Sequence, residues 1–108
     1  MVKKYRVIII PEALESLRKI TDYVRRKSSK ERSKYVLREI MKSVKSLTTF
    51  PEAHERVHDI CTENITYRRV LQWDYRVIYT IEEEWVRVII VEIVHGANDP
   101  SKLIDKFS

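Results

Sequence analysis

Histidine and cysteine residues in the middle of the chain have a spacing that metal sites use. His54, His58 and Cys61 follow the pattern His-x3-His-x2-Cys. On a helical turn these side chains would share one face, and His95 would supply a fourth zinc ligand. The run offers only three candidates, and no second cysteine pair supports it. We therefore expect no metal and no cofactor.

Cys61 is the only cysteine, so the chain forms no intrachain disulfide, and a reducing compartment is expected. No partner base for a Cys61 nucleophile is evident. The apolar run before Pro11 is too short for a signal peptide core, and no run approaches the length that spans a bilayer. We expect a cytoplasmic protein without membrane contact.

Arg76 and His95 each allow a structural and a chemical interpretation. On a strand, Arg76 shares a face with Thr80, near the level where Glu92 crosses from the next strand. The arginine would pair with Glu92 or bind a phosphate. His95 stands just before the only glycine and would hydrogen-bond a turn or transfer protons. Trp73 and Trp85 flank the hairpin ends, and we interpret them as packing residues rather than base-stacking ones.

Apolar periodicity predicts the elements that position these residues. Residues 2–10 are β-branched and predict a strand, and Pro11 suits the first turn of a helix that ends near residues 27–29. Ser28 and Glu31 form a capping box that predicts a second helix, ended by residues 48–51. Residues 51–66 show no period and predict a connection. Strands are expected at residues 67–72, 75–81 and 86–94.

The predicted fold class is α+β. An N-terminal strand precedes an antiparallel helical hairpin and a three-stranded antiparallel meander, and one small sheet packs on the helices. We expect a single domain over residues 1–108. Two helices cover only one face of a sheet, and strict alternation would leave Val88, Ile90 and Val94 beside Glu92 on the other face. We expect a partner or a second copy of the chain to cover this apolar patch.

Charge is distributed unevenly along the chain. Residues 1–49 carry fourteen Lys/Arg and five Asp/Glu, whereas residues 50–108 carry seven Lys/Arg and eleven Asp/Glu. The uneven distribution predicts that any polyanion contacts the first half. We interpret these cations first as solvated helix faces, and a dedicated nucleic-acid surface is the alternative.

An ordered set of segments resembles the RelE/ParE superfamily of toxins. The segments are Tyr5–Leu17, Leu47–Glu52, Tyr67–Leu71, Tyr75–Ile81 and Val91–Asp99, and they cover nearly the whole chain. The resemblance implies the toxin of a type II toxin–antitoxin, or plasmid stabilisation, system. It also implies an acidic, partly disordered antitoxin as partner, and a homodimer or a toxin–antitoxin heterotetramer as assembly.

The superfamily contains two mechanisms. RelE-type members cleave mRNA on the ribosome, and that resemblance would make Arg68, Arg69, Arg76 and His95 catalytic. ParE-type members inhibit DNA gyrase by binding. Asn98 stands where many RelE-type relatives carry arginine, and no tyrosine follows Tyr79. The ending His95–Leu103 is similar to the ParE-like branch.

We therefore expect a toxin that binds an essential target, DNA gyrase first. The alternatives are a ribosome-dependent endoribonuclease and a non-toxic relative that retains only partner binding. The expected partner-binding residues are drawn from the last strand, its neighbour and the C-terminal segment: Arg76, Val88, Ile90, Glu92, Val94, His95, Asn98 and Lys102.

Overall fold

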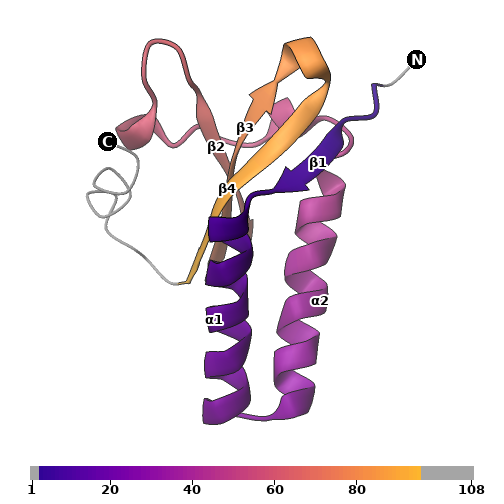
Figure 1. Ribbon diagram of the computed structural model, residues 1–108, viewed down its shortest axis with the longest axis vertical. Coiled ribbons are helices and arrows are strands. Elements are labelled where there is room, and N and C mark those ends of the chain that lie inside the picture. The colour runs from indigo at the N-terminus through magenta and orange to yellow at the C-terminus, as the bar shows by residue number, and fades with distance from the viewer. Residues whose placement is uncertain (1–2, 96–108) are drawn as a thin grey trace.

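A helical hairpin packs on one face of a four-stranded sheet in the computed structural model, which describes residues 3–95 (Figure 1). The expected α+β class is confirmed. In chain order the elements are β1 (Arg6–Ile9), α1 (Pro11–Lys27), α2 (Lys30–Ser46), β2 (Tyr67–Gln72), β3 (Tyr75–Glu82) and β4 (Arg87–His95). Short 3-10 turns lie at Pro51–Ala53, His58–Ile60 and Glu83–Trp85.

The sheet is mixed, with the strand order β1-β4-β3-β2. β2, β3 and β4 are antiparallel neighbours, which confirms the predicted meander. β1 pairs in parallel with β4. A parallel pair requires a long crossover connection, and here the chain passes through α1, α2, β2 and β3 between the two strands. This arrangement makes β1 and β2 the edge strands and places β3 and β4 at the centre.

The two helices begin where local chemistry allows. Pro11 opens α1, because a missing N–H costs nothing in a first turn. The cap of α2 is Ser29 and not the predicted Ser28: extended backbone at Ser29 lets its Oγ accept from the Arg32 N–H at 3.0 Å. Ser28 instead closes α1, since its N–H bonds to the Val24 carbonyl at 2.8 Å. Neither helix in residues 3–95 is long and apolar enough to cross a membrane.

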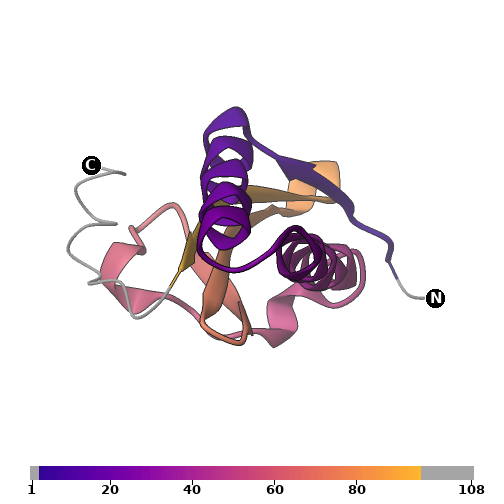
Figure 2. The ribbon, with the colours of Figure 1, turned by 90° about the horizontal axis from the view of Figure 1, so that it is seen from below.

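The main core lies between the helices and the sheet. Figure 2, which views the molecule from below, shows the two helices almost end-on. Leu17 of α1 and Ile40 of α2 pack against Val77, Tyr79 and Ile90 of the central strands, and all five side chains are buried. We call this side of the sheet the helix face.

A β-bulge changes which residues of β4 face the helices. Ile78 pairs with Glu92 and Tyr79 pairs with Ile90, so Val91 is an extra residue in β4. The prediction that Val88 and Ile90 lie on the uncovered face is wrong, because both are fully buried in the main core. Strict alternation counted along β4 fails because the bulge shifts the register by one residue.

The opposite side of the sheet, which we call the open face, is covered only in part. Val57 and Ile60 of the connection at residues 51–66 pack on Ile78, with Tyr67, Val91 and Val94 around them. The register places further residues of the central strands on this face: Arg76, Thr80, Ile89 and Glu92. The connection therefore closes a second, smaller core beside polar and charged side chains.

Candidate functional site

The four residues that the RelE-type resemblance would make catalytic lie on both faces of the sheet. Arg69 pairs with Ile78 and Arg76 pairs with Val94, which places both arginines on the open face. Arg68 pairs with Tyr79 and His95 pairs with Tyr75, both on the helix face. The sheet thus separates the four side chains into two pairs. They do not surround one phosphate, as transition-state stabilisation at a single centre would require.

Arg68 and Arg69 hold the connection against β2. The Arg68 Nη1 donates to the His54 carbonyl at 2.7 Å, and the Arg69 Nε donates to Glu55 Oε1 at 2.7 Å. The Arg69 backbone N–H also donates to the Glu55 carbonyl at 3.1 Å. These contacts give both guanidinium groups a structural role that the strand pattern alone did not indicate.

His95 ends β4 beside an exposed groove. Its ring centroid lies 4.8 Å from that of Tyr75, and the two rings line the groove with Lys19, Ile20 and Tyr23 of α1. Burial raises the pKa of the Tyr75 hydroxyl above its ordinary value, and nearby Arg32 opposes the change. Tyr75 is therefore neutral at physiological pH, and His95 packs on an uncharged ring.

Arg76, Glu92 and Val94 form the part of the expected partner surface that lies on the open face. Glu92 is buried, and its Oε1 accepts from the Ile93 N–H at 2.9 Å. The register places Arg76 diagonally across from Glu92, which is the arrangement that the predicted ion pair requires. The pair itself stays a prediction. Asn98 and Lys102 lie outside the described residues.

Tyr79 is a residue whose role the sequence did not reveal. Its hydroxyl, fully buried, donates to the Pro51 carbonyl and so anchors the start of the connection. Burial raises the pKa of this hydroxyl strongly, an effect that Arg68 opposes. A tyrosine on the apolar face of β3 was the only signal for this role.

The residues with the spacing of a zinc site make separate contacts in the structure. Cys61 Sγ accepts from the Tyr67 N–H at 3.2 Å and lies 3.3 Å from the Val57 carbonyl. The His54 ring packs edge-on against Tyr79, with centroids 6.4 Å apart. Within residues 3–95, no three His, Cys, Asp or Glu side chains come together as metal ligands.

Solved structures of toxin–antitoxin systems share this fold. The chain matches a chain of the chromosomal ParDE system from P. aeruginosa with a TM-score of 0.69 and 14% identity, covering 86% of this chain and 97% of that one. For the RelBE2 complex from Mycobacterium tuberculosis the TM-score is 0.63 at 18% identity, over 89% and 95% of the two chains. For the archaeal RelE–RelB complex from Pyrococcus horikoshii it is 0.60 at 17% identity, over 90% and 100%.

Sequence comparison identifies the protein family. No curated protein matches the chain. The family model described as the ParE toxin of the type II toxin–antitoxin system parDE matches residues 7–100. Because that match spans most of the sequence and the fold agrees with it, the chain belongs to the ParE toxin family, within the RelE/ParE superfamily of type II toxins.

Proposed function

We propose that this toxin acts in the cytoplasm, stops growth by binding DNA gyrase, and serves a plasmid stabilisation system. The observation that carries the proposal is the separation of Arg68 and His95 from Arg69 and Arg76 by the sheet. A nuclease needs a base, an acid and positive charge around one phosphate. An inhibitor that acts by binding needs only a surface, and membership of the ParE toxin family supports that mode of action.

The proposed partner is a cognate antitoxin whose acidic segment folds onto the open face. Arg76 and Val94 place a half-buried cation beside an apolar side chain on this face, and Val94 borders the second core that the connection forms. The solved ParDE and RelBE2 structures are described as toxin–antitoxin systems, which supports a partner of this kind. A disordered segment that folds on binding can cover a large area.

Supercoiling by purified gyrase tests the proposed target. The protein should inhibit supercoiling, and Arg76→Ala should weaken inhibition, because Arg76 lies on the proposed contact surface. Arg56→Ala removes an exposed arginine from the connection and serves as the matched control. Circular dichroism of both variants checks their folding.

Pulse-labelling of DNA and protein synthesis after induction tests the same target in cells. DNA synthesis should fall first. If protein synthesis falls first and supercoiling is unaffected, the gyrase proposal is wrong and the ribosome becomes the target. If neither synthesis falls, the chain is a binding protein without toxicity or a toxin whose target that host lacks.

A further inference from the structure

The helical hairpin carries concentrated positive charge at the end that extends past the sheet (Figure 1). Residues 25–34 include six Lys/Arg and a single acid, Glu31, and all seven of these side chains are exposed. The core cannot account for them, since none of these side chains packs in it. A surface of this charge attracts polyanions.

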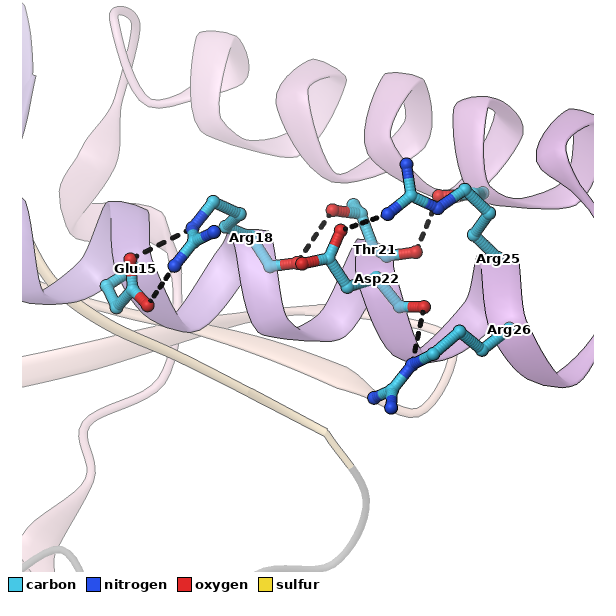
Figure 3. Close-up of polar contacts among 7 residues, drawn as sticks. Glu15, Arg18, Thr21, Asp22, Arg25 and Arg26 are labelled. Atoms are coloured by element: carbon cyan, nitrogen blue, oxygen red, sulfur yellow. Dashed lines mark hydrogen bonds and ion pairs between the residues drawn. The ribbon is translucent and has the colours of Figure 1, made fainter.

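Acidic neighbours neutralise part of the charge on α1 (Figure 3). Glu15 pairs with Arg18 at 2.6 Å, and Asp22 pairs with Arg25 at 3.0 Å. Arg26 instead donates from Nε to the Asp22 backbone carbonyl at 3.4 Å, which orients the guanidinium without cancelling its charge. The excess charge therefore lies mainly toward the hairpin turn and along α2.

α2 presents its cations in a regular row. Lys30, Lys34, Arg38 and Lys42 are exposed and follow each other at intervals of four residues. Neighbours in such a row are about 6 Å apart along the helix axis. Lys42 pairs with Glu39 at 3.1 Å. This basic row suits a linear ligand with evenly repeated negative charges.

An exposed aromatic pair lies beside the basic row. Tyr35 and Trp73 stack with ring centroids 5.4 Å apart, and the Arg32 guanidinium lies 5.8 and 5.9 Å from the two rings. Trp73 remains 50% exposed and Tyr35 39% exposed. Trp73 therefore packs on Tyr35 at the surface and not in the core. It occupies the β2–β3 turn at a φ of 54°, where a bulky residue is disfavoured.

A groove of about 360 Å³ adjoins the aromatic pair between the hairpin and the β2–β3 turn. Lys27, Arg32, Trp73 and His95 line it, and among residues 3–95 Asp74 is its only acidic lining residue. Two cationic side chains, Lys27 and Arg32, and the Trp73 ring thus line one depression.

We propose that this surface binds single-stranded nucleic acid, with phosphates along the basic row and unpaired bases on Trp73 and Tyr35. Cations close to exposed aromatic faces are the combination by which proteins hold unpaired strands. A base pair would deny its faces to the rings, and an acidic polypeptide would need the cations but not the stacked rings. DNA and RNA share the recognised chemistry. The inference goes beyond gyrase binding and does not rest on it.

Fluorescence anisotropy of the full chain with labelled oligo(dT), oligo(U) and a duplex of equal length tests the phosphate contacts. Single strands should bind more tightly than the duplex, and any preference between dT and U identifies the source. In Lys34→Gln/Arg38→Gln the plot of log affinity against log salt should be shallower by about 1.4, because each single-strand phosphate contributes about 0.7. Lys4→Gln/Arg56→Gln makes the same charge change at exposed positions elsewhere and should keep the slope.

Two tryptophans in different hairpins test the base contacts. Trp73→Asn keeps a residue that tolerates positive φ and should weaken single-strand binding by at least about fivefold. Trp85→Asn removes the other exposed tryptophan, which lies 5.6 Å below the Arg87 guanidinium, and should leave affinity unchanged. Circular dichroism checks the folding of each variant.

Three results would overturn the proposal: equal effects of the two tryptophan variants, duplex binding as tight as single-strand binding, or displacement of the oligonucleotide by polyglutamate at equal charge. The last result would identify an acidic polypeptide as the ligand. These measurements contain no gyrase, so their failure is distinguishable from failure of the gyrase proposal.

Discussion

The two faces of the sheet use the same strands for different purposes. On the helix face, Val77, Tyr79 and Ile90 are fully buried under two amphipathic helices. On the open face, charged and polar side chains such as Arg76 and Thr80 lie among apolar ones, and a connection with only short 3-10 turns covers part of this face. The comparison teaches that the stability of the fold comes mainly from one face, because that face holds the main core.

Substitution of two neighbouring isoleucines in β4 should give the largest difference in stability between the two faces. Ile90→Ala should lower the free energy of unfolding by about 2–5 kcal/mol, because it leaves a cavity in the fully buried main core. Ile89→Ala, on the half-buried open face, should cost no more than about 1.5 kcal/mol. Urea titration of both variants measures the difference. Equal losses would contradict the assignment of faces by the bulge.

Alkaline pH should lower the free energy of unfolding through the tyrosines of the main core. Tyr5, Tyr75 and Tyr79 belong to the main core, and burial raises the pKa of each hydroxyl. A raised folded pKa stabilises the protein fully below the unfolded pKa of about 10, and the contribution is lost as pH rises above that value toward the folded pKa.

Tyr79→Phe tests this effect at one site. At neutral pH it should cost about 1–3 kcal/mol, since the Pro51 carbonyl loses its donor. Above pH 10 the variant should lose stability less steeply than the wild type, as urea midpoints across the pH range would reveal. Parallel curves would mean that Tyr79 does not contribute to the alkaline loss.

Local patterns predicted the elements well because each depends on neighbours in sequence. The apolar period of the helices, Pro11 and the alternation in β3 act over a few residues, and the structure has elements at those places. Which residues of β4 face the helices could not be predicted, because the bulge at Val91 depends on the pairing of β4 with β3. The role of Tyr79 was equally hidden, since its acceptor Pro51 is distant in sequence.

The candidate site was predictable only as a set of residues. Resemblance to a family supplied Arg68, Arg69, Arg76 and His95, but not the faces on which they lie. Strand register decides that question, and the connection at residues 51–66 decides which arginines are already engaged. The connection has no sequence period that would predict its docking.

The smallest expected effect concerns how firmly the connection covers the open face. Arg69→Gln removes the ion pair between Arg69 and Glu55. Because the Glu55 side chain is well exposed, the free energy of unfolding should fall by at most about 1 kcal/mol. Local opening should change more, because the pair fastens the connection to β2 and lies outside the main core. Hydrogen exchange at the Val57 amide, which bonds to the Tyr67 carbonyl at 2.8 Å, reports that opening.

Exchange at Val57 should be faster in Arg69→Gln, while Arg56→Gln, a charge-matched change at an exposed position of the same connection, should leave it unaltered. Core amides such as that of Val77 should exchange alike in both variants, since the helix face is untouched. Unchanged exchange at Val57 would mean that apolar packing of Val57 and Ile60 on Ile78 holds the connection without the arginine. In that case Arg69 would be available to a partner on the open face at no cost to the fold.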